Sequence, residues 1–332
     1  MPGVYEGKCS RDERLIPLHE YSKSEQLRCR ACGERVVSGA DGNRMTPPIT
    51  REQIRDFEMH QARCVESLMR PVGEIKDNGQ GYAYFEKNGV RATLSTNPYA
   101  VWTTSAYGLT REMDRATLDE VIAFFKSHGV APRIRIVPEG FTMEKSARLA
   151  AHGLRHYGFH TVMWSPLLWH GRPARDLPQD TGESPVPQNI RIEHVTDPAE
   201  FDVALDTQIA GWGIPYNPDS PLKKLRRCWR TIPGHRTYLA YLDGQPAGHA
   251  MLFVDGKLGY LEQSSVIERF RKRGVHSALI RRRIAEAIEL GCDTIVGGAD
   301  FESPSRNNQM RAGLQIGYLA ALWSQDVPRT GG

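Results

Sequence analysis

The sequence predicts an α/β (α+β) protein in which two similar mixed-sheet domains, flanked by helices, follow a small zinc-binding module. Three observations predict it: a cluster of metal-binding side chains near the N-terminus, alternating helix-like and strand-like segments, and one order of segments that occurs twice. The length of 332 residues suits two domains of roughly 150 residues each. We place the zinc-binding module at 1–70, the first domain at 71–168, a linker at 169–189 and the second domain at 190–332.

The composition is that of an ordinary folded protein. It is 40% hydrophobic and 25% charged, which excludes a mainly disordered, collagen-like or disulfide-scaffold chain. The sequence contains no run of about 18 apolar residues and no signal-peptide core at its N-terminus. We therefore expect a cytoplasmic protein without a membrane partner, and we assume a monomer.

Four side chains near the N-terminus have the spacing of a zinc site. Two form a C-x-x-C pair before a glycine, and two lie four residues apart on one face of a helix that a capping box at Thr50 predicts. The expected ligands are Cys29, Cys32, His60 and Cys64. Because four protein ligands close the tetrahedron, the zinc would be structural. Cys9 or His19 could replace a ligand, and buried cysteines beside an unrelated histidine fit the same pattern.

The first domain begins with a hairpin at Asn88-Gly89, between two β-rich runs. Further strands and helices follow, and Gly129 and Gly153 end the two helices. The expected ranges are strands 82–85, 90–94, 134–137 and 159–164 and helices 118–128 and 145–152. Residues 171–189, with four prolines and few apolar side chains, indicate a linker.

The second domain repeats this order. A hairpin at Asp243-Gly244 precedes a strand, a helix ended by Gly291, and two more strands. The expected ranges are strands 238–241, 247–254, 259–266, 294–296 and 318–323 and a helix at 275–290. In both halves a Gly-Leu pair precedes a Gly-aromatic pair and a strand that ends in tryptophan, Trp164 or Trp323. The recurrence indicates an internal duplication.

A glycine-bearing turn connects a strand to a helix in the second domain. Free backbone amides at such a helix start bind pyrophosphate. Arg271 and Gly274 match the Gln/Arg-x-x-Gly-x-Gly/Ala signature of the GNAT acyltransferase superfamily, and with Asn308, Arg311 and Gly313-Leu314 the sequence resembles that superfamily over about residues 190–325. The resemblance implies a tandem GNAT protein whose first half, without such a turn, is a degenerate copy. It implies donor-binding roles for Val266, Arg271, Arg273, Gly274, His276, Ser277 and Asn308.

The same resemblance implies amide formation by direct attack of an amine on the donor. Glu262 lies where GNAT enzymes often carry a general base, and Ser265-Val266 corresponds to the stretch whose backbone amide stabilises the oxyanion, so we expect catalytic roles for Glu262 and Ser265. A surface strand glutamate fits Glu262 equally well. Two features depart from the pattern: His276 replaces a small residue, and residues 309–310 lack the tyrosine that often protonates the leaving thiolate.

The net charge of +4 hides an uneven distribution. Residues 223–283 hold fourteen basic and four acidic side chains, and the rest of the chain is net acidic. This excess over the needs of one CoA suits a nucleic-acid backbone, although a solvated basic helix face also fits. The expected tRNA- or phosphate-binding residues are Lys223, Lys224, Arg226, Arg227 and Arg230.

Three hypotheses follow for the function. The leading one is transfer of an aminoacyl group from aminoacyl-tRNA to a small-molecule or peptide amine, as in the Fem-like and antibiotic-pathway transferases, to which the similarity is architectural. It fits His276, the missing tyrosine, the basic residues and the zinc module together. The alternatives are an acetyl-CoA-dependent N-acetyltransferase of a small amine and a non-catalytic nucleic-acid-binding protein on a GNAT scaffold. Trp212 and Tyr216 could line the acceptor pocket, although an ordinary Gly/Pro turn fits them as well.

Overall fold

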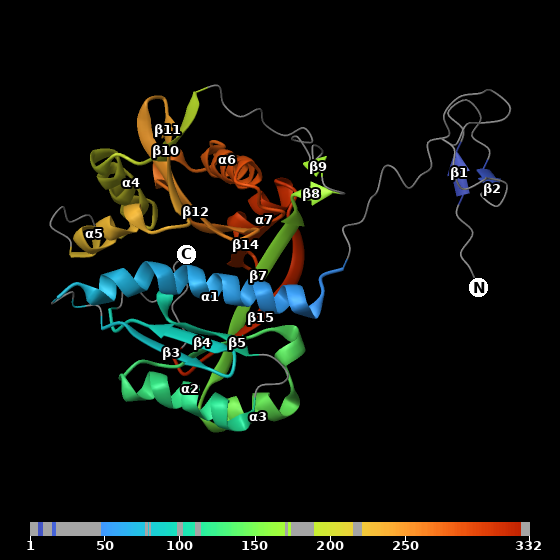
Figure 1. Cartoon of the computed structure of the whole chain (residues 1–332), viewed down its shortest axis with the longest axis vertical. Helices are drawn as coiled ribbons and strands as arrows, with labels where there is room; N and C mark the ends of the chain where they lie inside the picture. The colour runs from blue at the N-terminus through green and yellow to red at the C-terminus, as the bar shows by residue number, and fades with distance from the viewer. Residues whose placement is uncertain are drawn as a thin grey trace. The chain divides into compact units, whose positions relative to one another are not determined.

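The chain forms two compact units, Met1–Pro48 and Ile49–Gly332 (Figure 1). The computed structural model describes residues 6–8, 15–17, 48–76, 79, 81–97, 102–109, 114–169, 172–173, 189–214 and 221–326. In the first unit, strands β1 (Glu6–Lys8) and β2 (Leu15–Pro17) pair antiparallel. The division at Pro48 differs from the expected module boundary at residue 70, because the long helix α1 packs within the second unit.

The predicted elements of the first half are present in the second unit. Thr50 starts α1 through a capping box in which its hydroxyl accepts from Gln53 N–H (3.1 Å) and the Gln53 side chain accepts from Thr50 N–H (2.9 Å). The elements are α1 (Arg51–Glu74), β3 (Ala83–Lys87), β4 (Val90–Leu94), β5 (Ser105–Leu109), α2 (Arg115–Ser127), β6 (Arg133–Ile136), α3 (Met143–Ala151) and β7 (Arg155–Pro166). The short strands β8 (Leu168–Trp169) and β9 (Arg172–Pro173) pair with each other.

The second half adds three helices and a first strand to the expected pattern and otherwise follows it. Its elements are β10 (Ile190–Val195), α4 (Pro198–Gly211), α5 (Pro221–Arg226), β11 (His235–Leu242), β12 (Gln245–Asp255), β13 (Leu258–Val266), α6 (Val275–Glu289), β14 (Thr294–Asp300), α7 (Pro304–Arg311) and β15 (Gln315–Ser324). Both hairpin turns have two consecutive residues with positive φ, Asn88-Gly89 and Asp243-Gly244, as the sequence predicts.

One mixed sheet of eleven strands joins the two halves in the order β10-β11-β12-β13-β14-β7-β15-β6-β5-β4-β3. The order hairpin, strand, helix, strand, helix, strand occurs in each half, and the parallel pair β5–β6 of the first half corresponds to β13–β14 of the second. The last strand of each half, however, pairs with the other half: β7 lies beside β14, and β15 lies beside β6. Accordingly, Met163 of β7 is part of the hydrophobic core of the second half, and Trp323 of β15 is part of that of the first.

Helix α1 lies between the helices of the two halves (Figure 1). Its apolar side chains contact both parts of the sheet: Phe57 packs with β7, β14 and β15, and Leu68 packs with α4, β11 and β12. Burial of this helix on both halves places its side chains next to the middle of β13. Among the described residues, we find no helix with the length and apolar character needed to cross a membrane.

Candidate active site

Strands β13 and β14 separate part-way along their length. They pair only through Leu258–Leu261 and Thr294–Gly297, although both strands continue. At the same point β13 bulges against β12, so that Glu262 and Gln263 stand opposite one residue, Met251. Neighbours in a regular strand face opposite sides, but here both side chains line one cavity and Gln263 Nε2 donates to Glu262 Oε1 (3.1 Å).

The separated part of β13 presents backbone amides to the gap. Ile267 N–H bonds Ala247 O on β12, whereas Val266 O accepts from Arg271 Nε (3.2 Å) and so faces away from β12. Because hydrogen-bond direction alternates along a strand, the amides of Ser264 and Val266 point toward the gap and that of Ser265 toward β12. The predicted stretch Ser265-Val266 is therefore at the gap, but the Ser265 hydroxyl is buried and donates to Gln208 O (3.3 Å).

Helix α6 begins in a turn suited to an anion. Gly274 at the N-cap has φ +80° and Lys272 has φ +60°, both in the left-handed region. Within the described chain, no side chain caps this helix. Its first turn therefore leaves amide groups without helical acceptors, until Ala278 N–H bonds Gly274 O (3.0 Å). The positive end of a helix with free amides is a phosphate-binding site in many proteins.

The corresponding helix of the first half is blocked. At the start of α2, the side chain of Asp114 accepts from Thr117 N–H (2.6 Å), so a carboxylate already occupies the position that a phosphate would take. This difference explains in structural terms why only the second half keeps an anion-binding turn.

The predicted donor-binding side chains surround this turn in different ways. Arg271 holds the end of α4 to β13, because it donates to Gly211 O (3.1 Å) as well as to Val266 O. Arg273 is half-exposed and pairs with Asp243 (2.8 Å). His276 turns toward α7, where Asn308 Nδ2 donates to its Nδ1 (2.8 Å). Burial, with the nearby Arg283, lowers the pKa of His276 to about 4, so the ring is neutral at pH 7.

A polar cavity of about 280 Å³ extends from the gap between β13 and β14 to α1. Its wall includes Glu262, Gln263 and Ser264 from the bulged strand, together with His276 and Arg283 from α6. Two glycines of β14 leave room for polar side chains of the cavity wall. A Cβ at Gly297 would meet the Gln309 side-chain oxygen, and one at Gly298 would lie 2.5 Å from His160 Nε2. Gln309 and His160 also line the cavity.

A chain of hydrogen bonds leads from a buried arginine to Glu262. Arg226 can only donate, so its bond to Gln208 Oε1 (2.7 Å) fixes that amide; Gln208 Nε2 then donates to Gln263 Oε1 (2.8 Å). The Gln263 amide is thereby oriented to donate to Glu262. Arg226 itself lies over the rings of Trp212 and Trp229, and burial lowers its pKa to about 10. The chain therefore presents a hydrogen-bond donor to the Glu262 carboxylate.

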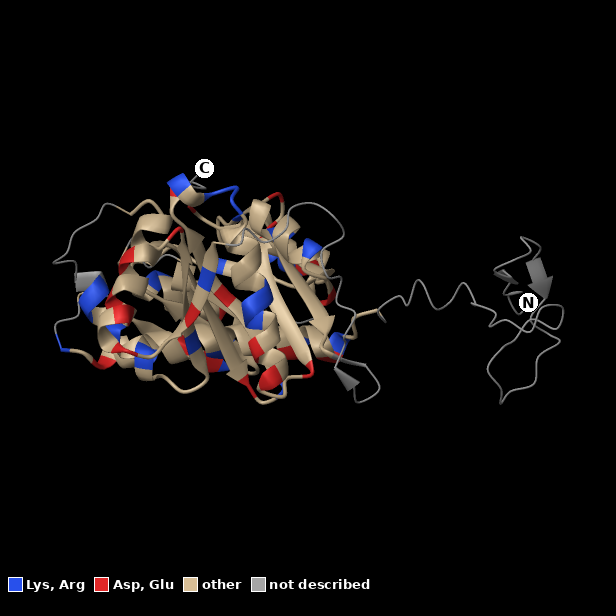
Figure 2. Ribbon diagram, turned by 90° about the horizontal axis from the view of Figure 1, so that it is seen from above, with Lys and Arg blue, Asp and Glu red and all other residues tan. Residues whose placement is uncertain are grey.

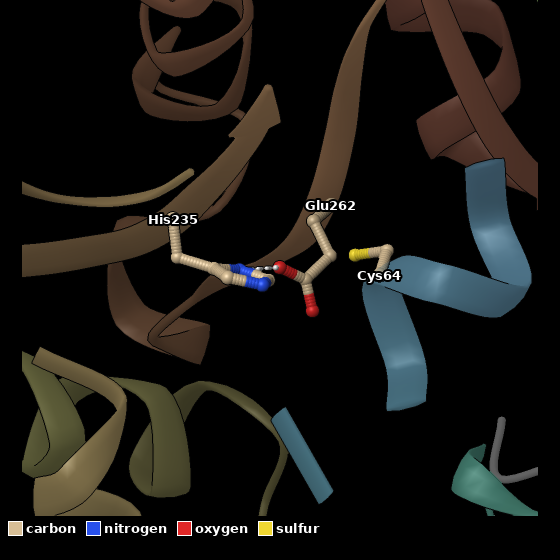
Figure 3. A group of neighbouring side chains, drawn as sticks. All are labelled: Cys64, His235 and Glu262. Carbon is tan, nitrogen blue, oxygen red and sulfur yellow. Dashed lines mark hydrogen bonds and ion pairs between the residues drawn. The ribbon is translucent and has the colours of Figure 1, made fainter. Parts of the chain in front are cut away.

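His235 and Cys64 lie on either side of Glu262 (Figure 3). His235 Nδ1 is 3.2 Å from Glu262 Oε2, and its Nε2 is 2.8 Å from Ser67 Oγ, which is also 2.9 Å from Cys64 O. The Ser67 hydroxyl thus connects the His235 ring to the backbone of α1 at Cys64. Burial, followed by the proximity of Glu262, raises the pKa of the Cys64 thiol.

The ligand atoms of Cys64, His235 and Glu262 lie within 4.8 Å of one another, so these three side chains could hold a metal ion. The expected ligand His60 is not part of this group: its ring packs on Phe253 (4.9 Å between centroids) and against Tyr260 (6.3 Å). Burial lowers the pKa of His60 to about 4. Cys29 and Cys32, together with Cys9 and His19, lie outside the described residues, so the four-ligand zinc site stays a prediction.

The predicted acceptor residue Trp212 caps the end of α4 and contacts Trp102, which lines the cavity, at 6.2 Å between ring centroids. Tyr216 lies outside the described residues.

Several predicted phosphate-binding cations are already paired. Lys223 bonds Asp206 (2.8 Å), Arg227 bonds Asp202 (2.8 Å), and Arg226 is buried under two tryptophans. Arg230 donates to a backbone carbonyl, and Lys224 is exposed. Acidic and basic positions are interspersed over the second unit (Figure 2). The basic sequence block is therefore not one continuous free cationic surface among the described residues.

Comparison with known proteins agrees with this geometry. Residues 201–309 match the model of the acetyltransferase (GNAT) family. The second half carries a GNAT acetyltransferase domain. The matched range contains the bulged β13, the α6 turn and β14, and the domain is that of an acyltransferase. No curated protein matches the sequence.

Solved structures show the same fold over both halves. A GCN5-related N-acetyltransferase from Kribbella flavida is 14% identical with a TM-score of 0.51, and the match covers 82% of this chain and 96% of that one. A tandem GNAT protein from the clavulanic acid biosynthesis pathway is also 14% identical with a TM-score of 0.51, and the match covers 84% of this chain and 97% of that one. A GCN5-related N-acetyltransferase from Sphaerobacter thermophilus is 13% identical with a TM-score of 0.50, and the match covers 81% of this chain and 92% of that one. The expected tandem GNAT arrangement is confirmed at the level of the fold.

Several residues of this site carry no local sequence signal. His235 is at the first position of β11, and Gln208 and Arg283 are on helices, so no local spacing associates them with Glu262. The one available signal was Gly297-Gly298 directly after the predicted strand 294–296, since glycines in a strand often indicate close approach of other groups.

Proposed function

We propose that the protein is an N-acetyltransferase that forms an amide between the acetyl group of acetyl-CoA and a small amine. The observation that carries this is the uncapped, glycine-led start of α6 beside the gap between β13 and β14. Acetyl-CoA supplies a thioester carbonyl and a pyrophosphate. The free amides of Val275, His276 and Ser277 suit the pyrophosphate, and the amides of Ser264 and Val266 suit the carbonyl oxygen.

Glu262 is the proposed general base. An ammonium group in the cavity must lose a proton before its nitrogen can attack, and the Glu262 carboxylate accepts that proton directly or through one water. The N–C bond then forms, the C–S bond breaks, and the departing sulfur leaves as the thiol after taking up a proton. Gln263 and His235 position the carboxylate, since each bonds one of its oxygens.

The paired cations favour acetyl-CoA over aminoacyl-tRNA as the donor. Three of the five side chains expected to bind tRNA phosphates are bonded to aspartates or buried. His276 no longer argues against a phosphate at the turn, because its side chain is held against α7. Retention of charged tRNA by the full chain, without binding of acetyl-CoA, would contradict our assignment of the donor.

Two glycines at the ends of α6 provide a matched test. Gly274 (φ +80°) and Gly291 (φ +77°) have the same left-handed backbone, so alanine strains each by about 1 kcal/mol. We expect G274A to weaken acetyl-CoA binding at least tenfold by calorimetry, because its Cβ approaches the anion site. G291A, at the far end of the helix, should bind as the native protein does. Equal affinities of G274A and the native protein would refute the assigned turn.

The role of Glu262 is tested by E262Q. We expect the rate of thiol release to fall by about 10²- to 10⁴-fold, the usual contribution of a general base, with acetyl-CoA affinity unchanged. Native activity in E262Q would exclude it as the base.

For the N-terminal residues we propose a structural zinc site at the Cys29 and Cys32 pair, in which Cys9 or His19 could replace His60 and Cys64, because both of these are buried within the second unit. Elemental analysis should find zinc in the native chain and less in C29S. A native chain without zinc would exclude the site.

A further inference from the structure

The cavity wall contains a buried positive charge without a carboxylate partner. Arg283 is 1% exposed, and its Nε donates to Leu279 O (3.1 Å). Its Nη1 donates to two backbone carbonyls, Met251 O (2.9 Å) and Glu262 O (2.8 Å). In the described part of the chain, no acidic side chain lies within 4.0 Å of its nitrogen atoms and no bond is made by Nη2.

The second arginine of the wall differs in this respect. Arg135 also lies at the cavity, but its Nε (3.1 Å) and Nη2 (2.8 Å) both donate to Glu58 Oε1. The Arg135 charge is thus paired directly with a carboxylate, whereas Arg283 makes no ion pair, and Glu262 is the acidic group that acts on it from a greater distance. A buried guanidinium without an anion is costly, and its planar donors match a carboxylate.

Arg283 and the proposed base are part of one structure. The bond from Arg283 Nη1 to Glu262 O attaches the guanidinium to the bulge from which the Glu262 side chain projects. A ligand in this cavity therefore meets, on the same wall, a carboxylate and a guanidinium that makes no ion pair. The cavity, at about 280 Å³, lies near the lower end of the range of small-molecule sites, which is about 300–1,000 Å³.

Other atoms of the wall also lack partners. Ser264 Oγ, His160 Nε2 and Gln309 Oε1 are buried without a hydrogen bond among the described residues. Buried polar atoms are normally satisfied, so these three suit further polar groups of a ligand or its bound water.

We propose that the acceptor is a small amine that also carries a carboxylate, an amino acid, with its amine at Glu262 and its carboxylate on Arg283. This rests on the proposed N-acetyltransferase function and specifies its substrate class. The carboxylate neutralises Arg283, and the ammonium group is placed where Glu262 can accept its proton.

The test compares matched pairs on the native full chain. The twenty standard amino acids, β-alanine and γ-aminobutyrate are assayed against the corresponding amides, with acetyl-CoA and a thiol reagent. The amide keeps the amine and the approximate shape of the carboxylate but removes its negative charge. We expect at least one acid to exceed its amide a hundredfold or more in kcat/KM. Amides or simple diamines used as well as the best acid would overturn the proposal and leave the acetyltransferase function intact.

The variant R283K addresses the residue itself. Lysine keeps a cation but lacks the planar pair of donors, so the ratio of acid to amide should fall at least tenfold while acetyl-CoA affinity stays within twofold. An unchanged ratio overturns the role of Arg283. Should R283K fail to fold, the matched pairs on the native chain decide alone.

Binding separates the two possible failures. Calorimetry on the native chain with acetyl-CoA present is expected to detect an amino acid and not its amide. Binding of no amino acid overturns the proposal. Absence of acetyl-CoA binding and of thiol release with every amine would instead refute the proposed function.

Discussion

Replacement of Glu58 by glutamine should strongly destabilise the second unit. Glu58 lies on α1, and its Oε1 accepts from Arg135 of β6 (2.8 and 3.1 Å) and from the Tyr318 hydroxyl of β15 (2.6 Å). The substitution keeps the shape and one acceptor oxygen but removes the negative charge. Arg135 would then be a buried cation without a counter-ion.

The burial of the pair determines the size of the effect. Glu58 is 1% and Arg135 5% exposed, and removal of one partner from such a pair typically costs about 3–5 kcal/mol. Because whole domains unfold at about 5–15 kcal/mol, the loss is a large part of the total. The exposed pair Lys87–Glu120, with side chains 46% and 42% exposed, provides the control: E120Q should cost about 0–1 kcal/mol.

Urea unfolding followed by circular dichroism measures both variants. The double variant E58Q/R135M removes the stranded charge, so it should be more stable than the sum of the two single losses by about 1–3 kcal/mol. A cost below about 1 kcal/mol for E58Q, equal to that of E120Q, would refute the argument that the buried pair fixes α1 to the sheet.

Three further predictions concern the cap of α1, acid stability and the cavity. T50A removes the capping box and should lower the free energy of unfolding by about 1 kcal/mol in urea, with unchanged activity. Burial lowers the pKa of His249 to about 3, so below about pH 6.5 the unfolded chain binds a proton at this histidine that the folded chain does not bind. The free energy of unfolding therefore decreases as the pH decreases, and this group alone should account for about 2 kcal/mol at pH 5. H249Q should therefore lose less stability between pH 7 and pH 5 than the native protein, and equal losses would contradict the shift. G297A forces the Gln309 side chain out of place and should reduce thiol release at least tenfold with an intact circular dichroism spectrum; native activity would show that Gln309 is dispensable.

Local sequence signals predicted the local structure well. The Asn88-Gly89 and Asp243-Gly244 turns, the Thr50 cap and the Gly274 helix start each depend on a few adjacent residues, and all four are present. The element order also predicted the duplication. These features need only backbone propensities and hydrophobic periodicity, which short segments carry in full.

Contacts between distant residues could not be predicted in this way. The spacing of His60 and Cys64 correctly places both on α1, but it cannot reveal that Cys64 meets Glu262, nearly two hundred residues later. The charge count of residues 223–283 likewise omits their partners, since Asp202 and Asp206 on α4 lie outside the counted range. The β-bulge, finally, depends on the register between two strands, and it is what brings Gln263 beside Glu262.

Because β7 pairs with β14 and β15 pairs with β6, each half of the chain needs the other half to complete its part of the sheet. Each half lacks the strand next to its own parallel pair and obtains it from the other half. We therefore expect that neither 1–180 nor 181–332 accumulates as a folded protein when expressed alone, whereas co-expression of both fragments restores one particle. Loss of the first half would therefore remove β7 from the sheet of the second half and leave β14 with an open edge.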